Sequence, residues 1–252
     1  MNYNVLFIVM DGCRFDTFEK ANTPNFDRIG KLYKAYSPSA GTAESYISYV
    51  YGGPPLGLPD EYIDSLYWKE FRDPNCFWKK KPDAYTFMLT GNPPIADISN
   101  LFSDSFDTIE FKRYRRIGDR LSISCGDIFK DCVNLTKDKE KFFGFLWLME
   151  THHPYSTDKV LPFNHIMKPE VWKRNQQLSI EFIDSKLGKL LDYLESRDDK
   201  TLVIALADHG DMMGEEVDGK QRWHHSIFNK QLRVTFHPKL FEIPYIQGII
   251  NE

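Results

Sequence analysis

The sequence has little cysteine and no apolar run long enough to cross a membrane. Its four cysteines, at positions 13, 76, 125 and 132, form no CxxC pair, which argues against a disulfide framework and favours reduced thiols. The first apolar run, residues 5–10, is too short for a membrane span, and no basic segment typical of a signal peptide precedes it. We therefore predict a cytoplasmic protein without a membrane segment.

The sequence also lacks a large excess of charge of either sign. Its 32 basic and 36 acidic residues give a net charge of −4, which argues against a nucleic acid polymer as a partner. Hydrophobic residues make up 42% of the chain and aromatic residues 15%, enough to bury a sizeable core. The 252 residues are predicted to form one α/β domain, 1–252, in which residues 60–140 are a variable insert region.

Three apolar runs, at residues 4–10, 142–149 and 202–207, each end abruptly in polar residues. Runs of this kind are typical of strands buried on both faces of a parallel sheet. Asp11 follows the first run, and Asp208-His209-Gly210-Asp211 follows the third. Because ligands of open α/β sheets bind just beyond the carboxyl ends of the strands, we expect these polar residues to meet in one site.

The residue types at these strand ends are suited to a divalent metal ion. Asp11 and Asp208 offer hard carboxylate oxygens, and His209 offers an imidazole nitrogen. Gly210 would let the chain turn sharply and bring its backbone close to a bound ligand. A strand followed by a polar turn would explain Asp-His-Gly alone, but the same pattern after two strands favours a metal site.

A hydroxyl at the start of a predicted helix is the candidate nucleophile. Small residues lead up to Thr42, and an amphipathic stretch follows it. The backbone N–H groups and the dipole at such a helix start favour an anion, so Thr42 could be a metal-activated nucleophile. Alternatively, Thr42 or Ser45 is only a helix cap. The adjacent His152 and His153, beyond another strand end, are candidates for contacts to a ligand or an anion.

The rest of the sequence pattern fits an α/β fold. Apolar residues recur at helical spacing over residues 169–197, and this helix leads into the strand that begins at Thr201, as in a parallel crossover. A shorter helix is predicted to begin at Thr23-Pro24, and further strands over residues 84–89 and 232–236. The predicted fold is α/β, with a mostly parallel central sheet flanked by helices on both faces.

Four blocks of the sequence together resemble the sulfatase-like branch of the alkaline phosphatase superfamily. They are residues 4–14 followed by Asn-Thr-Pro-Asn at 22–25, the segment Met-Glu-Thr-His-His-Pro-Tyr at 149–155, residues 183–188 leading into 206–215, and residues 225–234. The resemblance covers residues 1–50 and 142–238. It implies the alkaline phosphatase-like fold, with the usual C-terminal subdomain of that family truncated.

The resemblance implies a nucleophile that differs from that of true sulfatases. Those enzymes carry a cysteine, converted to formylglycine, where this sequence has Thr42. The phosphoryl-transferring relatives use threonine at this place. By the same resemblance, a zinc or manganese ion would be held by four residues: Asp11, Thr42, Asp208 and His209.

The resemblance also supplies roles for histidines. His152 and His225 would stabilise the transferring group or protonate the leaving oxygen. One metal ion is expected, and a second is left open, with Glu150, His152 or His153, and His225 as its possible ligands.

These inferences predict a metal-dependent hydrolase or transferase that acts on a phosphate ester, phosphodiester or phosphonate through a covalent intermediate on Thr42. Its partner would be a small anionic substrate, and a homo-oligomer could complete the pocket. Two alternatives remain. One is a sulfuryl-ester or sulfamate-ester hydrolase without formylglycine. The other is a catalytically silent relative that binds an anion, which the departure at Glu44 keeps open.

Overall fold

The computed structural model describes residues 3–51, 83–92, 95, 106–112, 115–117, 120–122, 125–158, 161, 168–224 and 237–251. The candidate catalytic residue His225 and the strand predicted over residues 232–236 lie outside these ranges. So does about half of the predicted insert region. Among the described residues, no helix is both long enough and apolar enough to span a membrane.

Seven strands of the described chain form the central sheet, and five of them are consecutive parallel neighbours. The order across the sheet is β2 (Leu32–Tyr36), β11 (Glu242–Ile250), β8 (Thr201–Ala207), β1 (Asn4–Met10), β7 (Phe142–Leu148), β3 (Tyr85–Thr90) and β4 (Thr108–Phe111). Strand β11 runs antiparallel to both β8 and β2. The prediction of an α/β fold with a mostly parallel sheet is therefore confirmed.

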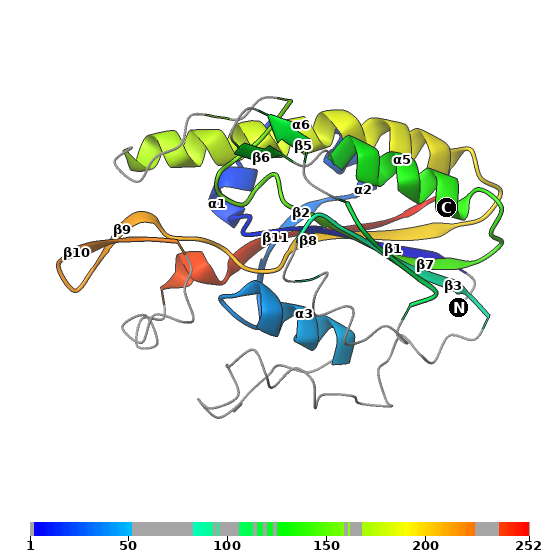
Figure 1. Ribbon diagram of the computed structural model, residues 1–252, viewed down its shortest axis with the longest axis horizontal. Helices are drawn as coiled ribbons and strands as arrows, with labels where there is room; N and C mark the ends of the chain where they lie inside the picture. Colours follow the sequence, from blue (N-terminus) through cyan, green and yellow to red (C-terminus); the bar gives the residue numbers. More distant parts are fainter. Residues whose placement is uncertain are drawn as a thin grey trace.

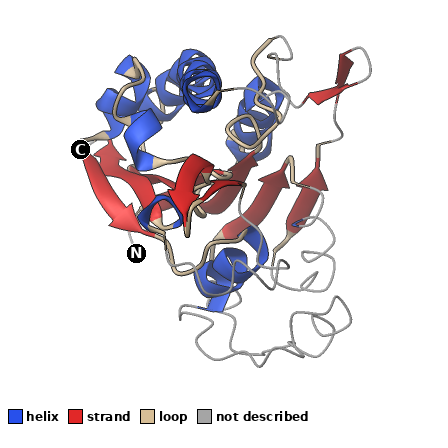
Figure 2. Ribbon diagram, turned by 90° about the vertical axis from the view of Figure 1, so that its left-hand side faces the viewer, coloured by secondary structure: helices blue, strands red, loops and turns tan. Residues whose placement is uncertain are grey.

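Helices cover both faces of this sheet (Figure 1). One face carries α1 (Phe15–Phe18), α2 (Pro24–Ile29), α5 (Cys125–Thr136) and the long α6 (Pro169–Glu195), whereas α3 (Thr42–Tyr51) lies on the other. Figure 2 shows the same layers from the side. Leucines and isoleucines at helical spacing on α6, among them Ile183, Leu187 and Leu191, are fully buried against the strands. This burial explains why the periodicity of residues 169–197 predicted the helix correctly.

Two small antiparallel sheets complete the described elements. Strands β9 (Met213–Val217) and β10 (Lys220–Trp223) form a hairpin, and β5 (Arg115–Ile117) pairs with β6 (Arg120–Ser122). The two turn residues of the hairpin, Asp218 and Gly219, have φ angles of 53° and 70°, as a type I′ turn requires. A short 3₁₀ helix, η5 (Pro238–Leu240), leads into β11.

The parallel strands deliver their carboxyl ends to one edge of the sheet. Met10 of β1 pairs with Leu148 of β7 on one side and with Ala207 of β8 on the other. The residues that follow these three strands therefore lie side by side, and they include Asp11 and Asp208. This alignment creates the candidate site.

Candidate metal centre

Asp11 and Asp208 meet at the carboxyl ends of β1 and β8, and both side chains are completely buried. Asp208 Oδ1 accepts hydrogen bonds of 2.9 Å from the backbone N–H groups of Gly12 and His209. Gly12 has φ +62°, a left-handed conformation that glycine adopts without strain. The tight turn after Asp11 thus directs the Gly12 N–H toward the Asp208 carboxylate and holds that carboxylate in place.

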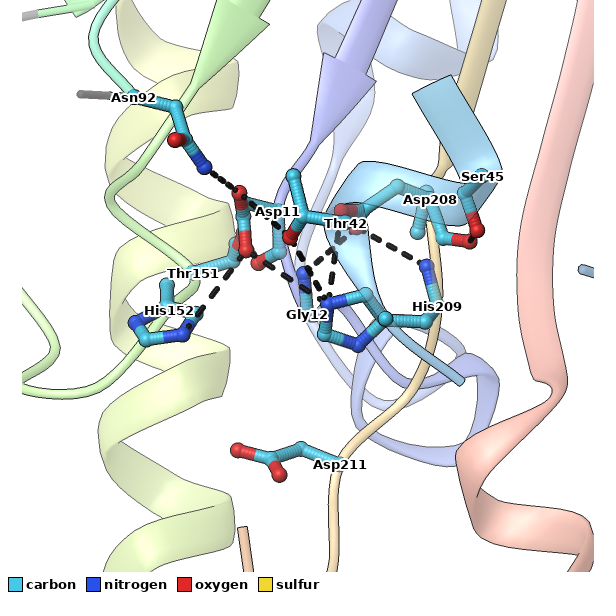
Figure 3. A network of polar contacts seen from close by, with 12 residues as sticks. Asp11, Gly12, Thr42, Ser45, Asn92, Thr151, His152, Asp208, His209 and Asp211 are labelled. Atoms are coloured by element: carbon cyan, nitrogen blue, oxygen red, sulfur yellow. Dashed lines mark hydrogen bonds and ion pairs between the residues drawn. The ribbon is translucent and has the colours of Figure 1, made fainter. Parts of the chain in front are cut away.

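His209 and Thr42 complete a compact cluster with these carboxylates. His209 Nε2 lies 3.4 Å from Asp208 Oδ2 and 3.9 Å from Asp11 Oδ1. Thr42 Oγ1 lies 3.2 Å from His209 Nε2 and donates a 3.4 Å hydrogen bond to Asp11 Oδ2. In Figure 3, Thr42 reaches the carboxylates from the start of α3. The structure therefore brings together the four residues predicted as ligands of one metal ion.

The charges and donor atoms of this cluster fit a divalent cation. Burial lowers the pKa of His209 below its usual value, so the imidazole is neutral and cannot balance two buried carboxylates. Its Nδ1 lies 2.6 Å from the carbonyl oxygen of Gly210, which makes Nδ1 the donor and leaves the lone pair on Nε2. Two carboxylates, one imidazole and one hydroxyl form a mixed oxygen–nitrogen set of the kind that binds zinc or manganese.

The first turn of α3 is fixed against the end of β8. Ser45 Oγ donates a 2.7 Å hydrogen bond to the carbonyl oxygen of Asp208, and the Tyr49 hydroxyl donates one of 2.9 Å to that of Ala207. The Thr42 hydroxyl faces Asp11 and His209, and Ser45 anchors this turn to the end of β8.

Two side chains that the sequence analysis missed hold Asp11 from the opposite side. Asn92 Nδ2 donates a 2.5 Å hydrogen bond to Asp11 Oδ2, and the Trp147 indole N–H donates one of 3.0 Å to the same oxygen. Asn92 lies two residues after the end of β3, at the same edge of the sheet as Asp11. A polar residue three positions after the strand predicted at residues 84–89 was the signal that could have identified it.

The loop after β7 brings His152 to the edge of the cluster. His152 Nε2 lies 4.0 Å from Asp11 Oδ1, and its ring is about one-fifth exposed. Its Nδ1 lies 2.6 Å from the carbonyl oxygen of His153. The Thr151 hydroxyl donates a 2.7 Å hydrogen bond to the carbonyl oxygen of Asp11. His152 is therefore positioned to face a group bound at the cluster.

Glu150, the residue before Thr151 in the loop after β7, is completely buried. Its Oε1 accepts a 2.5 Å hydrogen bond from the backbone N–H of Cys125, at the start of α5. Burial raises the pKa of Glu150 to about 7. Glu150 Oε1 thus satisfies a backbone N–H at a helix N-terminus, and its role as a ligand of a second ion together with His225, which lies outside the described residues, stays a prediction.

A different set of residues gathers beside the first cluster. His153, Asp211 and His224 place one potential ligand atom each within 4.8 Å of one another. Only His153 of this set was among the predicted ligands of a second ion. Neither Asp211 nor His224 was predicted as a ligand, because the match to the family motif pointed to His209, two residues before Asp211, and to His225, the residue after His224.

Gln176 on α6 forms hydrogen bonds with both the loop after β1 and the loop after β7. Its Nε2 donates 2.9 Å hydrogen bonds to the carbonyl oxygens of Gly12 and Thr151. Its Oε1 accepts hydrogen bonds from the backbone N–H of Arg14, at 3.1 Å, and from the Thr17 hydroxyl. One buried amide thus fixes the loop after β1 relative to the loop after β7.

Ion pairs around the buried Arg14 support the loop that carries Asp211. The Arg14 guanidinium contacts Asp16 at 2.8 Å and Glu215 at 2.6 Å, and it donates a 3.1 Å hydrogen bond to the carbonyl oxygen of Asp211. Burial alone would raise the pKa of Asp16, but its hydrogen bonds and ion pair with Arg14 lower it to about 2. The network is therefore charged at neutral pH and joins the loop after β1 to β9.

Comparison with protein families gives one match. The sulfatase family model matches residues 96–246, more than half of the chain. Comparison with curated proteins gives no significant sequence match.

Solved structures of three proteins share the fold. A protein of the alkaline phosphatase superfamily from Vibrio parahaemolyticus is 18% identical, with a TM-score of 0.65 over 98% of this chain and 60% of its own. The C-terminal periplasmic domain of EptC from Escherichia coli, in complex with Zn, is 14% identical (TM-score 0.69; 99% and 73%). The soluble domain of lipooligosaccharide phosphoethanolamine transferase A from Neisseria meningitidis is also 14% identical (TM-score 0.71; 100% and 77%).

Proposed function

The chain belongs to the sulfatase family, and from this membership and the geometry of its site we propose that it is a metal-dependent phosphoryl-transfer enzyme. Its substrate would be a small phosphate ester, phosphodiester or phosphonate, and Thr42 would form the covalent intermediate. The observation that carries the proposal is the Thr42 hydroxyl, which lies 3.2 Å from His209 Nε2 and 3.4 Å from Asp11 Oδ2. Support also comes from the similar fold of a phosphoethanolamine transferase.

Four residues would hold the cation: Asp11, Thr42, Asp208 and His209. A divalent cation bound by this set would lower the pKa of the Thr42 hydroxyl and neutralise charge on the reacting phosphoryl group. A zinc complex of a protein with the same fold supports zinc as the first ion to test.

The side chains have distinct tasks in the proposed reaction. Thr42 would lose its hydroxyl proton to water, and its Oγ1 would form the new bond to phosphorus while the ester P–O bond breaks on the opposite side. His152, at the edge of the cluster, would donate a proton to the departing oxygen. Water or another acceptor would then release the phosphoryl group from Thr42. A role for His225 in stabilising the transferring group stays a prediction.

Sulfate ester cleavage is the rival reaction, because the matched family model is that of sulfatases. The threonine at position 42 argues against it, since formylglycine is made from cysteine and none lies in this segment. The two reactions can be separated directly by the choice of chromogenic ester.

The test combines metal content with a substrate screen. Purified protein is loaded with zinc or manganese and assayed on p-nitrophenyl phosphate, bis-p-nitrophenyl phosphate, a phosphonate ester and p-nitrophenyl sulfate. We expect release from at least one phosphorus ester and a phosphorylated Thr42 peptide after acid quenching. Thr42→Ala should retain metal and lose turnover, Thr42→Ser should retain part of the turnover, and Asp208→Ala should lose both metal and turnover.

Three outcomes would contradict the proposal. Normal turnover in Thr42→Ala would show that the nucleophile is another group. Release from the sulfate ester alone would favour the sulfatase reaction. Bound metal without turnover of any ester would favour a relative that binds an anion without reacting with it.

A further inference from the structure

Trp147 is a buried side chain that links the central sheet, α3 and the candidate metal centre. It is the second-last residue of β7 and pairs with Val9 of β1, two residues before Asp11. Its side chain is completely shielded from solvent. A buried indole N–H needs an acceptor, and this one donates a 3.0 Å hydrogen bond to Asp11 Oδ2. Trp147 therefore contacts a residue that would bind the metal ion.

The two oxygens of Asp11 have different surroundings. Oδ2 accepts hydrogen bonds from the Trp147 indole at 3.0 Å, the Asn92 amide at 2.5 Å and the Thr42 hydroxyl at 3.4 Å. Oδ1 faces His209 Nε2 at 3.9 Å. Hydrogen bonds from two N–H groups to the same oxygen fix the rotation of the carboxylate, and they turn the other oxygen toward the cluster.

The ring of Trp147 packs on the helix that carries Thr42. Its centroid lies 5.9 Å from that of Tyr46, in an edge-to-face arrangement, and 6.5 Å from that of Tyr49. Both tyrosines belong to α3, about one turn and two turns after Thr42. Aromatic pairs add to the stabilisation that burial alone provides. The side chain that holds Asp11 thus also supports the first two turns of α3.

Helix α3 is attached to the sheet on two strands. Hydrogen bonds from Ser45 and Tyr49 attach it to the end of β8, and the aromatic contacts with Trp147 attach it to β7. Strand β1 lies between β7 and β8, so the two attachments flank the strand that Asp11 follows. The position of Thr42 relative to Asp11 therefore depends on Trp147 as well as on β8.

We propose that Trp147 is a positioning residue of the candidate metal centre and acts through two parts of one side chain. Its N–H holds Asp11 in the rotation that presents Oδ1 to a divalent cation. Its ring holds α3 so that the Thr42 hydroxyl stays next to Asp11. The role toward Thr42 rests on the proposed function, whereas the role toward the cation can be measured as zinc affinity, without turnover.

The test separates the N–H from the ring. Zinc affinity is measured by competition with a chromophoric chelator for Trp147→Phe and for a chain in which benzothienylalanine replaces Trp147. That analogue keeps two fused rings of nearly the same shape and has sulfur in place of the N–H, so it answers the question even if Trp147→Phe fails to fold. We expect both to bind zinc about 10- to 100-fold more weakly than the unmodified chain. Asp208→Ala, which lacks the first centre, gives the background of zinc bound elsewhere.

Phe145→Leu is the matched control for packing. Phe145 is also completely buried, and its ring lies 6.3 Å from that of Trp147, but it stands two residues further from the carboxyl end of β7. We expect this variant to lower the urea midpoint, as Trp147→Phe does, and to leave zinc affinity unchanged. Where turnover is present, kcat should fall further in Trp147→Phe than in the analogue, because only the analogue keeps the ring that supports α3.

Three results would overturn parts of this inference. Unchanged zinc affinity in the benzothienylalanine chain would refute the role of the N–H, whatever the turnover. An equal loss of zinc affinity in Phe145→Leu would show that Trp147 acts only through the stability of the core. Equal kcat values for Trp147→Phe and the analogue would refute the role of the ring. If zinc affinity falls as expected and the unmodified chain cleaves no ester, the role toward the cation stands and the proposed function fails.

Discussion

Asn92 donates a hydrogen bond of 2.5 Å from its side-chain amide to Oδ2 of Asp11, the oxygen that also accepts the Thr42 hydroxyl. Asn92 lies just beyond the carboxyl end of β3, and Asp11 lies just beyond that of β1. The two residues are 81 positions apart in the chain. It orients one carboxylate of the candidate metal centre from a strand that supplies no ligand.

We expect Asn92→Ala to lower the metal affinity of the first site about 10- to 100-fold, as loss of a residue that orients a ligand commonly does. Without the amide, Asp11 can rotate away from Asp208 and His209. The measurement is Zn²⁺ competition with a chromophoric chelator. Asn134→Ala, at an exposed position of α5, is the matched control, and equal affinities in the two variants would contradict the role of Asn92.

Gln176→Met should remove the hydrogen bonds that fix the loop after β1 and the loop after β7 to α6. Methionine fills a similar volume but cannot donate to the carbonyl oxygens of Gly12 and Thr151, which then stay buried without this donor. We expect the free energy of unfolding to fall by about 2–4 kcal/mol and kcat to fall more than KM changes, because Asp11 and His152 lose their fixed separation. Urea denaturation and steady-state kinetics provide the two readouts.

Gln177→Met is the control for Gln176→Met, since Gln177 is only partly buried and contacts Arg174 at 3.4 Å on the surface of α6. Its urea midpoint should be close to that of the unmodified chain. Equal midpoints for the two methionine variants would show that Gln176 does not hold the loops.

The elements that the sequence predicted correctly share one property: their signal is local. Strands β1, β7 and β8 are uninterrupted apolar runs because both faces of the sheet are covered, and α6 carries a regular apolar stripe. The clustering of Asp11, Asp208 and His209 followed from the geometry of parallel strand ends. Local pattern and general sheet geometry were sufficient for these features.

The features that were missed depend on contacts between distant segments. Strand β11 contains Pro244, Gln247 and Gly248, which interrupt its apolar pattern, and its antiparallel pairing with β8 is invisible in the sequence. The roles of Asn92 and Gln176 likewise follow from partners that lie far along the chain. The predicted cytoplasmic location and homo-oligomer stay predictions.

The buried carboxyl group of Glu150 should make stability depend on pH. Burial raises its pKa to about 7 from a usual value of 4.5, so the folded state binds the proton more tightly than the unfolded state does. This contribution to stability is complete below about pH 4.5 and is lost as the pH rises through 7. The loss is on the order of 3 kcal/mol.

Glu150→Gln removes this titration while retaining an oxygen that can accept from the Cys125 N–H. We expect the variant to be more stable than the unmodified chain at pH 8 and to show a flatter stability profile between pH 4.5 and 7. Urea denaturation across this range is the measurement, with Glu140→Gln, at an exposed position, as the control. An unchanged slope in Glu150→Gln would contradict the assignment.

Gly210 lies against another backbone segment, a contact that the sequence did not indicate. A Cβ atom at this position would lie 2.0 Å from the carbonyl oxygen of Lys239, and the Gly210 N–H donates a 2.8 Å hydrogen bond to the carbonyl oxygen of Leu240. The loop after β8 is therefore packed directly on η5. Movement of either the loop after β8 or η5 would break the hydrogen bond between Gly210 and Leu240.

Gly210→Ala should lower the free energy of unfolding by about 3 kcal/mol or more, since the clash is with backbone and cannot be relieved by a side-chain rotation. It should also weaken metal binding, because the Gly210 carbonyl oxygen orients the His209 ring. Gly219→Ala is the matched control: Gly219 has φ +70° but nothing within 4 Å of its Cβ position, so only conformational strain of about 1 kcal/mol is expected. If urea denaturation gave both alanine variants the same stability, the close contact between Gly210 and Lys239 would be refuted.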